Sequence, residues 1–188
     1  MNWFDDYRDK LGIRYETFLN LFTEANKRQL KTVVETGTSR GKDKFYYIRP
    51  KINWKDGMST ILFAHYAKEN NGEFWSCDIS KKNISNASFF LKKYKLDGNL
   101  VVSDSLTFLK KFNKDIDILY LDSLDGQIPG ANEHQLKEAQ IAISKMNDKG
   151  LIMLDDKGLK TELSLLFLQN MNWRVKYESN QQIILHKL

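Results

Sequence analysis

Residues 32–38 read TVVETGT, and this stretch decides the fold class. Val33 and Val34 lie in a short apolar run, which predicts a buried β-strand over residues 32–36. The run ends in polar residues and then in Gly37, which is typical of a strand that turns sharply into the next element. A helix is expected after this turn.

Similar apolar runs recur along the chain. They predict strands over residues 73–78, 100–103, 116–122 and 150–155. Two more strands are expected over residues 173–178 and 181–186, because Ser179-Asn180 between them resembles a tight hairpin turn. Apolar residues at helical spacing lie between the strands, and the expected helices span residues 15–28, 58–68, 84–94, 106–112, 133–146 and 159–171.

The alternation of strands and helices predicts an α/β protein with a mostly parallel sheet. Helices that connect parallel strands cover both faces of such a sheet, so its strands are continuously apolar, as they are here. The hairpin at the C-terminus would add an antiparallel strand. We expect one domain over residues 1–188, with a helical segment at 1–30 and no linker.

Composition excludes several classes of protein. Cys77 is the only cysteine, and the three histidines (His65, His134 and His186) lie far apart. These facts rule out an internal disulfide and argue against a cysteine or histidine metal site. The sequence has no apolar run long enough for a membrane span and no signal-peptide pattern at its start. We therefore expect a cytoplasmic protein without a membrane partner.

The net charge is +5, and lysines supply most of the positive charge. The basic residues are scattered and no run reaches five, so solvated helix faces explain most of them. A nucleic-acid partner is not favoured by this pattern.

Polar residues follow all five strands of the predicted parallel sheet. Because ligands bind at the carboxyl ends of such strands, these residues predict one shared ligand site. They are Glu35-Thr36-Gly37-Thr38, Asp78-Ile79-Ser80, Ser103-Asp104-Ser105, Asp122-Ser123 and Asp155-Asp156.

This set of residues resembles the class I S-adenosylmethionine-dependent methyltransferases, from about residue 32 to the C-terminus. The resemblance implies a Rossmann-like, doubly wound sheet of seven strands and S-adenosylmethionine as cofactor. Asp78 would hold the ribose hydroxyls, and Asp104 with Ser105 would lie on the adenine side. The residues expected to bind the cofactor are Glu35, Thr36, Gly37, Thr38, Gly57, Ser59, Thr60, Asp78, Ile79, Ser80, Asp104, Ser105 and Asp122.

The first motif has unusual spacing. A ribose-binding acid is expected about 20 residues after the glycine turn, but Asp78 lies 41 residues after Gly37 and 21 after Gly57. An insertion over residues 39–55 accounts for the difference. It is rich in aromatic and basic residues, so it is interpreted as a lid that would favour an anionic acceptor, with a packed surface loop as the alternative.

Asp122, Asp155 and Asp156 follow neighbouring strands of the resembled fold. Three adjacent carboxylates repel one another unless a cation joins them, and Mg²⁺ prefers such oxygen ligands. Metal-dependent O-methyltransferases of this family carry acids at these strand ends, so the resemblance implies a divalent metal at these three residues. Alternatively, Asp155 and Asp156 cap the next helix, or Lys157 and Lys160 neutralise the acids.

The catechol-type enzymes of that group carry a lysine soon after the acid that follows the fourth strand, and this sequence has none there. We therefore assign catalysis to Asp122 and to His134 as general base, because an imidazole titrates near neutral pH. A surface position on a helix is the alternative for His134.

Three functions remain open from the sequence. The leading one is methyl transfer to a hydroxyl of a small molecule. The second is nucleic-acid methylation, which is supported only by the basic charge. The third is a protein that binds or degrades the cofactor without methylating an acceptor. A homodimer is also left open.

Overall fold

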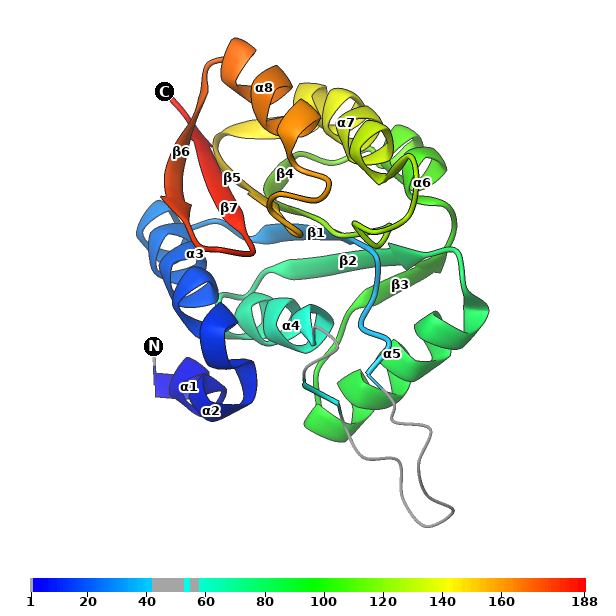
Figure 1. Cartoon of the computed structure of the whole chain (residues 1–188). Helices are drawn as coiled ribbons and strands as arrows, with labels where there is room; N and C mark the ends of the chain where they lie inside the picture. The colour runs from blue at the N-terminus through cyan, green and yellow to red at the C-terminus, as the bar shows by residue number, and fades with distance from the viewer. Residues whose placement is uncertain (1, 42–52, 55–57) are drawn as a thin grey trace.

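The computed structural model describes residues 2–41, 53, 54 and 58–188. In this part of the chain seven strands form one sheet in the order β3-β2-β1-β4-β5-β7-β6 (Figure 1). Strands β1 to β5 are parallel to one another, whereas β7 is antiparallel to both β5 and β6. The strands are β1 (Thr32–Thr36), β2 (Glu73–Asp78), β3 (Asn99–Val102), β4 (Ile116–Leu121), β5 (Met146–Leu154), β6 (Trp173–Glu178) and β7 (Ile183–Lys187).

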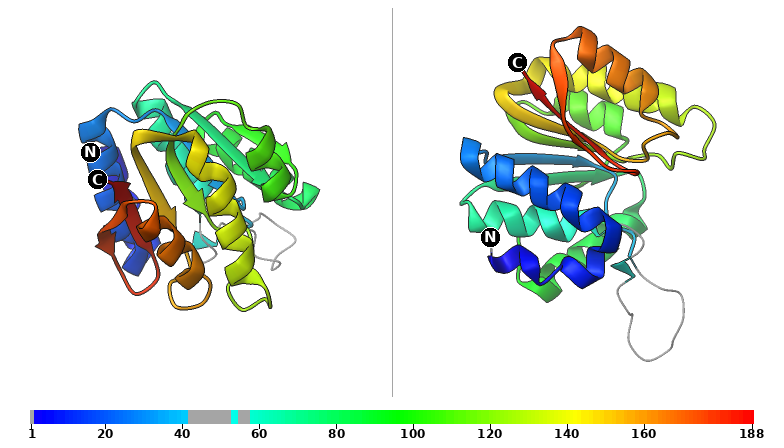
Figure 2. Two further views of the ribbon diagram at one scale, coloured as in Figure 1. Left: turned by 90° about the horizontal axis from the view of Figure 1, so that it is seen from above. Right: turned by 60° about the vertical axis from the view of Figure 1, so that its left-hand side comes forward.

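Helices cover both faces of the sheet, as the views in Figures 1 and 2 agree. On one face lie α3 (Tyr15–Arg28), α4 (Ser59–Glu69) and α5 (Lys81–Tyr94). On the other lie α6 (Ser105–Lys111), α7 (Ala131–Ala142) and α8 (Glu162–Asn170). Short helices α1 (Asn2–Asp5), α2 (Arg8–Leu11) and η1 (Gly12–Arg14) precede α3. The predicted α/β, Rossmann-like fold with a closing antiparallel hairpin is confirmed.

The pleat of the strands creates two separate hydrophobic cores. Side chains alternate between the faces of a strand, so Val33 packs with α3 and α4 while Val34 packs with α6 and α7. In the same way Tyr120 and Leu121, next to each other in β4, enter opposite cores. This two-sided burial explains why the strands are apolar at successive positions.

Several predicted boundaries differ from the structure, and the largest differences lie where α7 ends and β5 begins. The helix expected over residues 133–146 ends as α7 at Ala142, and the short 3₁₀ turn η3 (Ile143–Lys145) leads directly into β5. Met146 pairs with Ile116 of β4, and the register then shifts before Ile118 pairs with Leu151. Pairing in the sheet therefore overrides the helical spacing of the apolar residues in this segment.

The order of the strands defines where a ligand can bind. The chain runs outward from β1 through β2 to β3, then returns to β4 on the opposite side of β1. The crevice outside the carboxyl ends of β1 and β4 is therefore the switch point at which open α/β sheets bind ligands. Among the described residues, no helix is long and apolar enough to cross a membrane.

Candidate functional site

The turn after β1 brings the backbones of β1 and β4 very close together. Gly37 has φ +84°, and a Cβ atom at this position would lie 2.3 Å from the carbonyl oxygen of Asp122. The Asp122 amide donates a 3.0 Å hydrogen bond to the carbonyl of Thr36. Only glycine combines this positive φ with so close an approach, so Gly37 sets the floor of the crevice.

A buried carboxyl group supports this turn from below. Glu35 is fully buried, and its Oε2 accepts hydrogen bonds from Thr60 Oγ1 at 2.8 Å and Ser76 Oγ at 2.6 Å. Thr60 and Ser39 are also joined by two reciprocal bonds between backbone amides and hydroxyls. Burial raises the pKa of Glu35 to about 7, although the hydroxyl donors oppose this shift. Glu35 therefore ties β1 and β2 to the start of α4.

The carboxylate of Asp78, at the end of β2, organises the next part of the crevice. Its Oδ2 accepts hydrogen bonds from the Thr38 amide (3.3 Å), the Thr38 hydroxyl (3.2 Å) and Asn83 Nδ2 (3.0 Å). Its Oδ1 accepts one from the Ser80 amide at 2.8 Å. The side chain is thereby fixed at the surface of the pockets, where remaining lone pairs can accept hydrogen bonds from a ligand.

Two adjoining pockets run along this edge of the sheet and share five lining residues. The first has a cavity volume of about 130 Å³ and the second about 200 Å³. The shared residues are Gly37, Asp78, Ile79, Ser123 and Leu124. We call the two pockets together the groove. It offers apolar side chains for a flat ring and a carboxylate for hydroxyl groups, which is the chemistry of a nucleoside site.

The first pocket continues to the ends of β3 and α7. Asp104 lies in its wall and caps α6, because its Oδ1 accepts a 2.9 Å hydrogen bond from the Thr107 amide. The hydrogen bonds from Thr107 lower the pKa of Asp104. His134 Nε2 lies 2.9 Å from Ser105 Oγ and 3.7 Å from a carboxylate oxygen of Glu138, which is buried behind it.

The second pocket contains Asp122 at the end of β4, together with residues from the loops after β1 and β4. Arg40 and Asp125 both line this pocket and form a 3.0 Å ion pair. His134 lines only the first pocket, so the two residues predicted to be catalytic, His134 and Asp122, lie in different parts of the groove.

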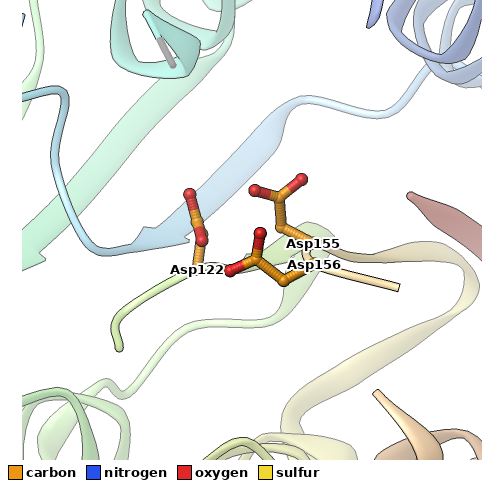
Figure 3. A group of neighbouring side chains, drawn as sticks. All are labelled: Asp122, Asp155 and Asp156. Atoms are coloured by element: carbon orange, nitrogen blue, oxygen red, sulfur yellow. The ribbon is translucent and has the colours of Figure 1, made fainter. Parts of the chain in front are cut away.

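The three acids predicted to hold a metal do lie together. One carboxylate oxygen from each of Asp122, Asp155 and Asp156 lies within 4.8 Å of the others (Figure 3). However, the ammonium group of Lys160 lies 2.8 Å from Asp122 Oδ1 and 3.0 Å from Asp156 Oδ2. Burial lowers the pKa of Lys160, but the charges of Asp122 and then Asp156 outweigh burial, and the pKa is raised.

Asp155 is paired separately from the other two acids. Its Oδ1 accepts a 2.7 Å hydrogen bond from Gln182 Nε2, and its Oδ2 lies 3.7 Å from Arg14 Nη2. Arg14 also bonds Gln181 at 3.0 Å, which links the N-terminal segment to the turn between β6 and β7. Lys157, by contrast, turns outward to Glu178. Two protein cations, Lys160 and Arg14, therefore pair with the three carboxylates, while burial and then the charge of Asp155 raise the pKa of Asp122 well above its ordinary value. With these pairs in place the cluster does not fit a divalent ion.

The structure sorts the predicted cofactor residues into two groups. Glu35, Thr36 and Thr60 are fully buried beneath the groove and do not line it, so their direct contact with a ligand is not supported. The others among the described residues line the groove: Gly37, Thr38, Ser59, Asp78, Ile79, Ser80, Asp104, Ser105 and Asp122. Gly57 and residues 42–52 and 55 of the predicted lid lie outside the described residues.

Several residues of the site were missed from the sequence. Leu124 lines both pockets, and Arg14 and Gln182 hold Asp155. No local pattern marks these three residues, because they come from segments far apart in the chain. Lys160 was not missed, because the sequence offered Lys157 and Lys160 as cations that could neutralise the acids. The structure shows Lys160 in this role and Lys157 paired with Glu178 instead.

Comparison with known proteins agrees with this geometry. The family model described as "Methyltransferase domain" (Methyltransf_24) matches residues 54–157, which is more than half of the chain. The chain therefore belongs to this methyltransferase-domain family. No curated protein matches the sequence.

Solved structures share the fold at low sequence identity. The methyltransferase PaMTH1 of Podospora anserina, bound to S-adenosylhomocysteine (SAH), has a TM-score of 0.67 and 13% identity over 100% of this chain and 85% of that one. A Staphylococcus aureus protein described as a caffeoyl-CoA O-methyltransferase has a TM-score of 0.67 and 12% identity, over 98% of this chain and 92% of that one. An rRNA methylase of Streptococcus thermophilus has a TM-score of 0.63 and 10% identity, over 94% of this chain and 96% of that one. These likenesses establish the fold of class I methyltransferases.

Proposed function

We propose that this protein transfers a methyl group from S-adenosylmethionine to a hydroxyl oxygen of a small molecule. The observation that carries the proposal is the groove, whose first pocket suits a nucleoside and whose second pocket places Asp122 beside it. S-adenosylmethionine, when bound, supplies an electrophilic methyl group for in-line transfer to a nucleophile. The residues of the chain then have to bind the cofactor and to position the acceptor oxygen.

The first pocket supplies the groups that a nucleoside requires. Asp78 accepts hydrogen bonds from vicinal hydroxyls, and four protein donors already hold its carboxylate in place. Ile79, which is 76% exposed, and Leu124 provide apolar surface for a base. His134 and Ser105 offer polar groups at the same pocket. We therefore assign His134 to cofactor binding, and its role as a general base stays a prediction.

The second pocket supplies the acceptor side. Asp122 presents a partly exposed carboxylate there, which can accept the hydrogen bond of an incoming hydroxyl and, during transfer, its proton. The ion pair of Arg40 and Asp125 belongs to the wall of the same pocket. A pocket of about 200 Å³ with such walls suits a small acceptor better than a nucleic-acid duplex.

Nucleic-acid methylation is the second candidate. The net charge of +5 would favour association with a phosphate backbone, and an rRNA methylase is among the structures that share this fold. A surface that binds RNA through charge would lose affinity steeply as salt rises. The small-molecule proposal requires no such salt dependence.

Two measurements test the proposal in sequence. Calorimetric titration of the purified protein with SAH should show one site per chain. Transfer of a labelled methyl group from S-adenosylmethionine should then be assayed with a panel of small hydroxyl compounds and, separately, with rRNA. Absence of SAH binding would refute the proposal outright. Label on rRNA alone would establish the second candidate, and loss of S-adenosylmethionine without any labelled acceptor would indicate a cofactor-degrading protein.

A further inference from the structure

The side chain of Lys160 lies among the carboxylates at the ends of β4 and β5. This side chain is only 1% exposed. Because a lysine is rarely buried so completely unless its charge is paired, partners are expected around the ammonium group. Its Nζ lies 2.8 Å from Asp122 Oδ1, 3.0 Å from Asp156 Oδ2 and 2.7 Å from the carbonyl oxygen of Leu124. An ammonium group has three N–H donors, and three acceptors surround it here.

The backbone fixes Lys160 at this position. Its amide donates a 3.2 Å hydrogen bond to the carbonyl of Asp156, four residues earlier, which closes a single turn with helical spacing. Asp156 itself adopts φ +58°, a left-handed conformation that costs free energy for any residue other than glycine. The turn is tied to the C-terminal hairpin, because the Lys157 amide donates a 2.8 Å hydrogen bond to the Gln181 carbonyl. Lys160 is therefore not a surface lysine that can swing away freely.

Each of the three acids already has at least one carboxylate oxygen engaged by a protein group. Asp156 Oδ2 accepts a 3.1 Å hydrogen bond from the Gly126 amide in addition to its ion pair with Lys160. Both oxygens of Asp155 face Gln182 and Arg14. A divalent ion binds oxygen at about 2.0–2.6 Å, so it would have to displace the ammonium group from the same carboxylates. Displacement would break the three contacts of the ammonium group and leave a buried charge without its partners, which is strongly unfavourable.

We propose that Lys160 is the resident cation of this acidic cluster and holds Asp122 at the groove in place of a divalent metal ion. Lys160 acts as a positioning residue, because its ammonium contacts Asp122 and lies behind the pocket wall. The carboxylate of Asp122 then keeps one fixed oxygen on Lys160 and presents the other toward neighbouring groups. This inference rests on the proposed function only where it assigns Asp122 to the acceptor side.

The experiment measures binding of Mn²⁺ after treatment with a chelator, by the loss of the free-ion signal in electron paramagnetic resonance. The wild-type protein is expected to bind no Mn²⁺ more tightly than about 1 mM. Lys160→Ala leaves three adjacent acids with space for an ion, so its Mn²⁺ affinity is expected to rise at least about tenfold. Lys157→Met is the matched control, since that lysine pairs with Glu178 outside the cluster. It should behave as wild type.

One result would overturn the inference: stoichiometric, sub-millimolar binding of Mn²⁺ by the wild-type protein that Asp156→Asn abolishes. If Lys160→Ala fails to fold, the wild-type titration still decides between the two outcomes. SAH titration of the same metal-free samples separates this question from the proposed function. Failure to bind SAH would refute the proposed function, whereas the Mn²⁺ result reports on Lys160 independently.

Discussion

The hydroxyl of Thr60, in the first turn of α4, donates a 2.8 Å hydrogen bond to the buried carboxyl group of Glu35 at the end of β1. The acid that opens the first motif therefore acts inside the protein, beneath the turn that forms the groove. Its burial, which raises its pKa to about 7, has a measurable consequence for stability.

We expect Glu35 to make the folded protein less stable as pH rises from about 4.5 to about 7. In the unfolded chain Glu35 titrates at its ordinary pKa of 4.5, whereas in the folded protein it titrates at about 7. The folded state thus binds more protons in this window. The stability due to protonated Glu35 is complete below the lower pKa and is lost as pH rises through the upper one. A difference of this size corresponds to about 3 kcal/mol.

Urea denaturation of wild-type protein and of Glu35→Gln, at about pH 5 and about pH 8, checks this expectation. The amide of the variant does not titrate. As pH rises from about 5 to about 8, the free energy of unfolding of the wild type should therefore fall relative to that of Glu35→Gln. Glu133→Gln, at an exposed position in α7, is the control and should show no comparable shift. A gap that does not change between the two pH values would contradict the raised pKa.

Gly37→Ala is expected to destabilise the protein much more than Gly130→Ala. The two glycines have nearly equal φ angles, +84° and +85°, so both variants carry the same backbone strain, about 1 kcal/mol. At Gly37 the new methyl group would also lie 2.3 Å from the Asp122 carbonyl, while nothing lies within 4 Å at Gly130. Thermal unfolding should therefore show an excess loss of at least about 2 kcal/mol at Gly37. Equal losses would argue against the close approach of β1 and β4.

Asp78→Asn is expected to weaken SAH binding by about ten- to a hundredfold. The amide group would place N–H donors where the carboxylate now accepts bonds from Thr38, Ser80 and Asn83, and it would remove a charged acceptor for the ligand hydroxyls. Loss of a hydrogen bond to a charged group costs about 1.5–3 kcal/mol, which corresponds to this range. Calorimetry measures the change, with Asp97→Asn, an exposed position before β3, as control. Unchanged affinity in Asp78→Asn would mean that the ligand lies elsewhere.

His134→Ala separates two roles for this residue. Its place beside Ser105 in the first pocket predicts weaker SAH binding, by about threefold to thirtyfold, for the loss of one or two polar contacts. His186→Ala, on β7, serves as control. If instead turnover falls by a hundredfold or more while SAH affinity stays constant, His134 is the general base that the sequence first suggested.

The fold was largely predictable because buried parallel strands must be apolar along their whole length. The helix over Tyr15–Arg28 has the predicted bounds, since its apolar face and its polar ends are local properties of that segment. The end of α7 was not predictable in this way. Residues near Met146 continue the helical spacing, and only the partner strand, through the pairing of Met146 with Ile116, shows that they are extended.

Some features of the candidate site could likewise be predicted from the sequence, and others could not. Polar residues at the strand ends, such as Asp78 and Asp122, could be found because every parallel strand delivers its carboxyl end to one edge of the sheet. The sequence could not predict whether such a residue faces the groove or the protein interior. Glu35 is buried and bonded to hydroxyl groups of α4 and β2, whereas Asp78 lines the groove.

The sequence by itself determined the order of strands and helices and the set of polar residues gathered at one edge, because alternation, periodicity and turn residues are local. The tertiary structure alone decided which charges meet there. Lys160 is 38 positions from Asp122 along the chain, and its Nζ lies 2.8 Å from that carboxylate. A burial site for an ammonium group exists only once β4, β5 and the turn after β5 have packed together, because electrostatic contact depends on distance in space and not along the chain.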